Sequence, residues 1–245
     1  MDRGGEVWLM HEPSHAQFVA GKAGWDGEKP KPDGAMAVIP VFGVLAHRCP
    51  EWALDFGYID TSAIGRAVRA ADADPAIGSI ALAFHSPGGQ AMGVPEVAAM
   101  IRGASKPTIG VTDGMCASGA YWLASQCDRL IATPSARVGS IGCFVAFYDY
   151  SEHFKKAGVS VDVIKSGAEK GAGIMGTSLT DEQRKRIQAE VIAIHAQFKK
   201  AVKRVRVNAS EEDMEGQVYD GREAARRGLV TGMANSIEDA LASGR

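Results

Sequence analysis

The sequence predicts an α/β fold in which repeated β/α units build a largely parallel sheet. Apolar segments of strand length alternate with amphipathic segments of helix length, and this order is typical of parallel sheets. The chain has 245 residues, enough for one such domain, and shows no internal repeat that would require a second. We expect residues 1–35, which are rich in Gly, Pro and Lys near their end, to form a partly flexible lead-in and residues 36–245 to form the domain.

The first half of the domain shows the alternation most clearly. Residues 37–45 form an apolar strand pattern, 61–74 have helical spacing, and 79–89 form a strand that ends abruptly at two glycines. The next expected elements are a helix over 95–105, a short strand over 107–114 and a helix of small residues over 118–126.

The second half continues the same order. We expect strands over 128–134, 141–150 and 159–167, with a helix over 150–158 between the last two. Residues 181–206 form a long amphipathic helix, with acidic residues near its start and basic residues near its end, as the helix dipole favours. A short helix and a closing turn are expected over 220–230.

Composition excludes several classes of function. The net charge of -2 gives no general reason to expect nucleic acid or a membrane surface as a partner. The N-terminus has no signal-peptide apolar region, and no apolar run reaches the roughly 20 residues that a membrane helix needs. We therefore expect a soluble, cytoplasmic chain. The four cysteines have no zinc or disulfide spacing, so we expect reduced thiols, no metal and no cofactor (Cys49, Cys116, Cys127 and Cys143).

Functional groups in parallel sheets gather at the carboxyl ends of the strands. One candidate is the HSPGG turn at residues 85–89, where Gly88 and Gly89 free the backbone to point amides at a developing oxyanion. A simple turn is the alternative. A second candidate is Ser118 at the start of the 118–126 helix, where Gly119 offers a further amide. Ser118 could equally be an ordinary N-cap.

A nucleophilic serine needs a neighbouring base. Lys170 lies among small residues after the expected strand 159–167, so it could enter a cleft where loss of water lowers a lysine pKa. Lys165 is a rival base, and His85 and His153 could serve as imidazole bases. The histidines are more consistent with structural positions, because strand alternation turns His85 away from the glycine amides and His153 lies in an ordinary amphipathic helix.

Five motifs together resemble the signal peptide peptidase A-like family of serine proteases, which includes head-maturation proteases of tailed phages. They cover roughly residues 36 to 235 and occur in the family's order: IPVFGVL, FHSPGGQAMG, DGMCASGAYWLAS, ATPSARVGSIG and KSGAEKGAG. The resemblance implies a single-domain ClpP/crotonase-like fold and a Ser/Lys dyad. Ser118 matches the nucleophile, Lys170 the general base, and Ser140 a serine that orients the lysine. Gly88 or Gly89 and Gly119 match the oxyanion hole.

The resemblance implies a serine endopeptidase that acts through an acyl-enzyme, with polypeptide substrates such as capsid and scaffold proteins. It further implies a homo-oligomer working in the host cytoplasm or the immature phage head. An extended substrate is expected to pair with two segments (Gln90, Ala91 and Met92; Ile141, Gly142 and Cys143). The alternatives are a bacterial peptidase of the same family, a crotonase-type acyl-CoA enzyme and an inactive assembly scaffold.

Overall fold

The computed structural model describes residues 8–10 and 36–242, and its centre is a sheet of five parallel strands. Most of the expected lead-in, residues 1–7 and 11–35, lies outside the described residues. The strand order is β12-β9-β7-β5-β2. These strands are β2 (Met36–Phe42), β5 (Ser79–His85), β7 (Thr108–Thr112), β9 (Arg129–Ala132) and β12 (Gly232–Met233). The predicted α/β class with a mostly parallel sheet is confirmed.

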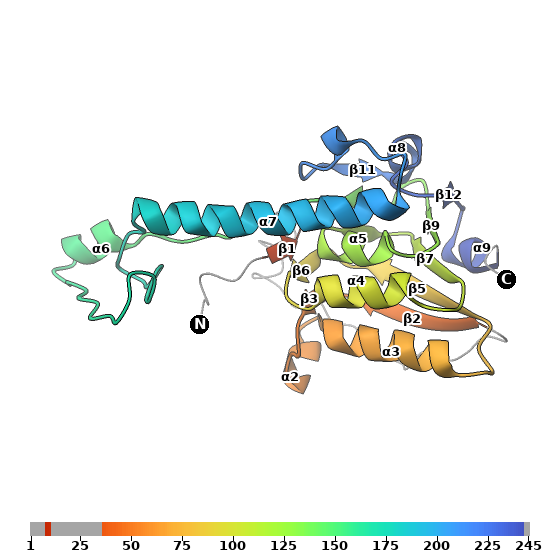
Figure 1. Cartoon of the computed structure of the whole chain (residues 1–245), viewed down its shortest axis with the longest axis horizontal. Helices are drawn as coiled ribbons and strands as arrows, with labels where there is room; N and C mark the ends of the chain where they lie inside the picture. The colour runs from red at the N-terminus through yellow and green to blue at the C-terminus, as the bar shows by residue number, and fades with distance from the viewer. Residues whose placement is uncertain (1–7, 11–35, 243–245) are drawn as a thin grey trace.

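Helices cover both faces of this sheet, which explains why its strands read as continuous apolar runs. Residues 80–84 of β5 are all buried. The larger core lies between the sheet and α3, α4 and α5, while a smaller core lies against α9 on the other face. Figure 1 shows α3, α4 and α5 stacked along one side of the sheet, with α7 running across α5. The helices are α2 (Glu51–Leu54), α3 (Thr61–Ala73), α4 (Val94–Arg102), α5 (Gly119–Ala124), α6 (Ser151–Lys156), α7 (Asp181–Val205), α8 (Gly221–Arg226) and α9 (Ile237–Ala242), with a 3-10 turn η1 (Glu211–Asp213).

Two small sheets lie at the edge of the body and carry the predicted site. The first has the order β1-β6-β3-β4 and the second the order β11-β10-β8. Their strands are β1 (Trp8–Met10), β3 (Val44–Ala46), β4 (Tyr58–Asp60), β6 (Gly88–Gln90), β8 (Met115–Ala117), β10 (Arg137–Gly139) and β11 (Val218–Asp220). The sequence predicted only β2, β5, β7 and β9 as separate strands. It missed the other strands because each of them is only two or three residues long.

An arm, defined here as residues 144–180, leaves the body between the second small sheet and α7. Figure 1 shows α6 and the following segment beside the far end of α7, away from α5. The strands expected over 141–150 and 159–167 are wrong, since no regular strand forms in either. Both segments have apolar residues at strand spacing, but they run outside the sheets. Apolar spacing alone does not make a strand without a neighbour to bond.

The C-terminal half of α7 anchors this long helix to the body. The rings of Phe198 and Trp122 stack with centroids 4.6 Å apart and an angle of 7° between their planes. Phe198 is fully buried, and so is Val202 one turn further on. Near its start α7 has a capping box between Thr180 and Gln183, but of its buried residues only Gln183 lies in that half. One end of α7 is therefore fixed by core packing while the other supports the arm.

We expect Phe198→Ala to lower the free energy of unfolding by about 3 kcal/mol or more, because it removes a fully buried ring and leaves a cavity beside Trp122. Urea unfolding followed by circular dichroism measures this change. Ile192→Ala on the same helix is the matched control: Ile192 is 59% exposed, so its loss should change the free energy by less than about 0.5 kcal/mol. Equal effects of the two substitutions would contradict the anchoring by Phe198.

Candidate active site

Ser118 stands at the junction between β8 and α5 in a strained backbone conformation. Its φ is 54° and its ψ is −123°, a region that residues other than glycine rarely occupy. The Ser118 amide donates to the carbonyl of Gly139 at 2.8 Å, and the Ser118 Oγ donates to the carbonyl of Gly142 at 3.4 Å. A sharp, strained turn from strand to helix is typical of serines held out for nucleophilic attack.

The structure argues against Ser118 as an ordinary N-cap. An N-cap serine accepts a hydrogen bond from an amide in the first turn of its helix, and Ser118 makes no such side-chain bond. Its Oγ instead donates to the carbonyl of Gly142. The strain at Ser118 therefore has no compensation from helix capping, which leaves a role for the hydroxyl itself as the better explanation.

A second strained serine, Ser140, lies in the turn whose carbonyl groups accept the hydrogen bonds from Ser118. Its φ is also 54°, and Gly139 before it has a φ of 123°. The Ser140 amide donates to the carbonyl of Gln217 at 2.6 Å. The parallel pairing of β8 with β10 places Gly139 opposite Ala117. The predicted residues Ser118, Ser140 and Gly142 are therefore brought together by one pair of strands.

The glycine turn lies next to the same strand. Ser86 forms a bridge with Cys116 on β8, through bonds of 2.7 Å to Met115 and 3.1 Å from Ala117. Gly88 and Gly89 follow on β6, and α5 packs against this strand. The Gly119 amide is the first of α5 and has no partner within the helix. The glycine turn and the helix start thus both lie beside the nucleophile, and their service as oxyanion donors stays a prediction.

The predicted substrate segments lie on both sides of this junction. Gln90 accepts a hydrogen bond from the His47 amide at 2.9 Å, Ala91 is buried, and Met92 is 70% exposed. On the other side Ile141 is fully buried. The Cys143 thiol donates to the carbonyl of Val191 at 3.1 Å, and burial raises its pKa to about 11. Cys143 is therefore a packed thiol rather than a nucleophile.

Lys170 is not brought to Ser118 within one chain. It lies exposed in the turns of the arm, whereas Ser118 is buried in the body. Figure 1 shows the segment between α6 and α7 at the end of α7 remote from α5. The rival bases lie elsewhere too: Lys165 donates to the carbonyl of Ala168 at 2.9 Å on the arm, and His153 belongs to α6.

His85, the remaining alternative base, ends β5 and packs against its neighbours. Its ring lies edge-on to the ring of Phe42, with centroids 6.4 Å apart. It also lies so close to Gly114 that a Cβ there would be 2.2 Å from the His85 Nδ1. These contacts are consistent with the structural position expected for His85.

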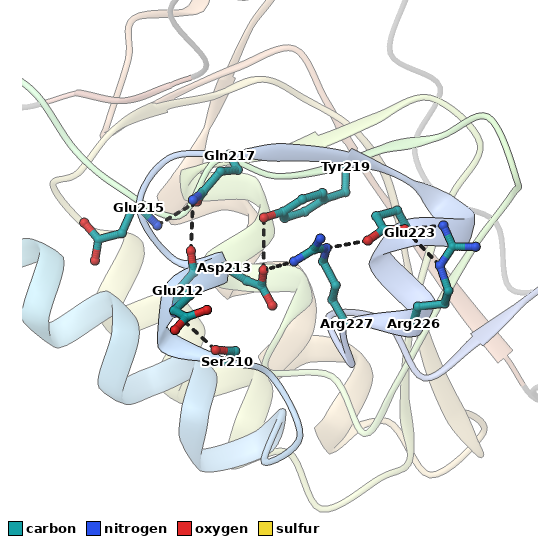
Figure 2. A network of polar contacts seen from close by, with 9 residues as sticks. All are labelled: Ser210, Glu212, Asp213, Glu215, Gln217, Tyr219, Glu223, Arg226 and Arg227. Carbon is teal, nitrogen blue, oxygen red and sulfur yellow. Dashed lines mark hydrogen bonds and ion pairs between the residues drawn. The ribbon is translucent and has the colours of Figure 1, made fainter.

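A polar network that sequence reasoning missed supports the Ser140 turn. Figure 2 shows Asp213 accepting from the Tyr219 hydroxyl at 3.0 Å and paired with Arg227. The Gln217 side chain donates to the carbonyl of Glu212 at 2.9 Å. This bond fixes the position of Gln217, whose own carbonyl accepts the hydrogen bond from the Ser140 amide. These partners lie more than 70 residues beyond Ser140, so no local sequence pattern predicts them.

Comparison with known proteins identifies the family. The profile of Peptidase family S49 matches residues 101–243, more than half of the chain, and this range contains Ser118, Ser140 and Lys170. The chain belongs to Peptidase family S49. It is 32% identical over 208 residues to the head-tail preconnector protein GP5 of Enterobacteria phage P21, covering 83% of this chain and 41% of that protein. It is 30% identical to the capsid assembly protease C of Escherichia phage lambda, covering 83% of this chain and 47% of that protein. The S49 chain thus spans less than half the length of these two relatives.

Solved structures confirm the fold of this S49 chain. A point mutant of ClpP1 from Listeria monocytogenes superposes with a TM-score of 0.53 at 10% identity, over 83% of this chain and 94% of that one. An enoyl-CoA hydratase/isomerase of Marinobacter aquaeolei gives 0.51 at 16% identity, over 87% and 72%. Both likenesses concern the fold alone.

The described residues contain neither a metal-binding cluster nor a membrane-spanning helix. Within residues 8–10 and 36–242, no group of three or more His, Cys, Asp or Glu side chains is placed to hold a metal ion. None of the helices in this part of the chain has the length and apolar character needed to cross a bilayer.

We expect Gly89→Ala to destabilise the S49 domain by about 2 kcal/mol, because a Cβ at this position would lie 2.0 Å from the carbonyl oxygen of Leu45 on β3. Chemical denaturation of the two proteins measures the difference. Gly167→Ala on the arm is the control, since nothing lies within 4 Å of its Cβ. A Gly89→Ala protein as stable as wild type would show that β3 and β6 are less tightly packed than described.

The arm should loosen in acid. Hydrogen bonds from the Ser151 and Ser178 side chains hold the pKa of Asp149 at about 2, below its usual 3.8. A depressed folded-state pKa stabilises the arm above about pH 4, and this contribution is lost as the pH falls toward 2. Amide hydrogen exchange of α6, corrected for intrinsic rates, should therefore show falling protection between about pH 5 and pH 2.5.

Asp149→Asn should remove most of this pH dependence, because the amide does not titrate. Glu152→Gln is its matched control on α6: that carboxylate makes only an exposed ion pair of 3.8 Å with Lys155, so the change should leave the acid response in place. An acid response unaffected by Asp149→Asn would assign the titration to another group.

Proposed function

We propose that this S49 chain is a serine endopeptidase that hydrolyses peptide bonds through Ser118, Lys170 and an acyl-enzyme. The observation that carries the proposal is the backbone strain at Ser118, a buried serine whose side chain makes no helix-capping hydrogen bond. Family membership and the presence of Lys170 and Ser140 within the matched range support it. A crotonase-type enzyme needs no nucleophilic serine, and a scaffold needs no strained one.

The proposed chemistry is that of a serine activated by a lysine base. Lys170, as the neutral amine, takes the proton of the Ser118 hydroxyl while Oγ attacks the substrate carbonyl. Amides of the glycine turn and of Gly119 stabilise the oxyanion, and the lysine returns the proton to the leaving amine. Water then hydrolyses the ester by the reverse sequence of proton transfers. We assign to Ser140, in the turn that contacts Ser118, the task of holding the incoming amine.

We further propose that the lysine reaching Ser118 comes from a second copy of the chain. A lysine acts as a base where burial removes water from its amine. Lys170 lies exposed on the arm, next to Ala168 and Glu169, which contact the first turns of α7. An arm that docks on the neighbouring body would bring the two together and bury the amine. Because the arm and the body are different surfaces, this contact is heterologous and can close into a ring.

The surface of the arm supports such a contact. Large apolar side chains are exposed along it (Tyr148, Tyr150, Val159, Ile164, Ile174 and Met175), and Ile164 is 95% exposed. A patch of this kind on a chain without membrane-spanning helices among its described residues is typical of a protein interface. The arm's own fold is maintained by contacts such as the Arg186–Glu169 pair at 2.6 Å, which leave this apolar surface uncovered.

We propose capsid and scaffold proteins as the substrates, and the host cytoplasm or immature phage head as the place of action. This follows from the relatives' names, a head-tail preconnector protein and a capsid assembly protease. A bacterial peptidase of the same family is the near alternative. Both would cut extended, unfolded segments that pair with strand edges beside the nucleophile.

The dyad can be tested by mixing two inactive variants. Ser118→Ala and Lys170→Ala should each lower the cleavage rate of an unstructured protein by at least about 10³-fold. If the lysine acts across the interface, an equimolar mixture of the two should regain up to about a quarter of the wild-type rate, since that share of sites pairs an intact serine with an intact lysine. If the two variants assemble with each other and the mixture still stays inactive, the dyad lies within one chain.

Two controls accompany the mixture. Ser118→Ala mixed with the double variant Ser118→Ala/Lys170→Ala has no intact serine and should stay inactive. Lys165→Ala, which alters a neighbouring exposed lysine on the same arm, should keep near wild-type activity; its inactivity would assign the base to Lys165 instead. Labelling of Ser118 by a serine-reactive acylating inhibitor should be lost in Ser118→Ala.

A further inference from the structure

The N-terminal strand β1 pairs with the strand of the glycine turn. Trp8, Leu9 and Met10 run antiparallel to β6, with Trp8 opposite Gln90, Leu9 opposite Gly89 and Met10 opposite Gly88. The paired strands are separated by residues 11–87, so this pairing is not a hairpin. Figure 1 shows β1 in red beside β6, at the side of the body from which the arm projects.

With β1 in place, β6 has no free edge. Its other edge pairs with β3, where Leu45 lies opposite Gly89 so closely that a Cβ on Gly89 would meet the Leu45 carbonyl oxygen at 2.0 Å. The strand is three residues long, and each of its residues has a partner in β1. A further strand can add to β6 only if β1 leaves.

The edge of β6 that β1 covers lies near the candidate nucleophile. Ser86, two residues before β6, is bridged to Cys116, two residues before Ser118. Because β1 is antiparallel to β6, its residue nearest this bridge is Met10, opposite the oxyanion candidate Gly88. An extended peptide that adds to β6 with its chain directed toward Ser118 would have the same direction and register.

We propose that residues Trp8–Met10 are an intramolecular occupant of the substrate edge, which a substrate must displace. The inference rests on the proposed peptidase function. The inference also gives the substrate a direction, antiparallel to β6. The substrate residue nearest the bond to be cut then lies opposite Gly88. All three residues of the occupant are apolar, as the side chains of unfolded protein segments often are.

The effect on kinetics follows from competition. A segment of the same chain is present at an effective concentration of about millimolar, so even a short strand competes with dilute substrates. If β1 occupies the edge for about nine-tenths of the time, the apparent KM rises about tenfold while kcat stays the same. Leu9→Pro, which cannot donate a strand hydrogen bond, should lower KM toward the unoccupied value. Leu9→Val, which retains strand preference, should not.

A reversible lock tests the occupancy directly. Residues directly opposite in an antiparallel pair have Cα atoms about 4.5 to 5.5 Å apart, within the range of a disulfide. In Trp8→Cys/Gln90→Cys we expect an intrachain disulfide under mild oxidation, at least a tenfold loss of cleavage rate, and recovery on reduction of the same sample. Each single variant controls for the native cysteines and should show no redox response.

In the disulfide experiment, the proposal is overturned if peptide mapping finds no intrachain disulfide, or if a complete disulfide leaves the cleavage rate unchanged. Failure of the peptidase function itself is separable, because neither disulfide formation nor peptide binding requires catalysis. On Ser118→Ala/Leu9→Pro, a fluorescent peptide with the sequence of residues 5–13 should bind, and Ser118→Ala with β1 intact should bind it at least about fivefold more weakly. Equal binding to the two proteins would also overturn the occupancy.

Discussion

The hydrogen bond from the Ser118 amide to the carbonyl of Gly139 is the constraint on which the site depends. It extends the parallel pairing of β8 and β10 by one residue, to the point where the chain must turn into α5. A strand partner on one side and a buried helix on the other leave Ser118 no relaxed conformation. The strain, about 1 to 3 kcal/mol, is sustained because both neighbours are fixed by the core.

The outer support of this constraint lies on β11, which pairs with β10 on its other edge. The network of Asp213, Tyr219 and Arg227 holds β11 against the body, and Gln217 fixes the turn before it. The turn containing Ser140 is thus held between the nucleophile and a segment from the C-terminal part of the chain.

The parts predictable from the sequence were those with a local signal. Continuous apolar runs revealed β5 and β7, and glycines with a serine at a helix start pointed to the candidate nucleophile and its amides. Strands such as β10 escaped because three residues have no periodicity and their partners are distant in sequence. Residues 144–150 and 159–167 misled because their apolar residues belong to the arm, where a strand has no sheet to join. Lys170 was recognisable from its motif as a candidate base, but its separation from Ser118 was not, since spacing along a chain does not tell how far apart two residues lie in the fold.

The length of α7 has a consequence for when the proposed enzyme can work. Because α7 carries Lys170 away from its own Ser118, the proposed hydrolysis needs two chains rather than one. The number of proposed active sites then rises more steeply than the protein concentration. A newly made, dilute chain would therefore have little proteolytic activity. Crowding alone, as within a closed shell, would start digestion without any separate activating signal.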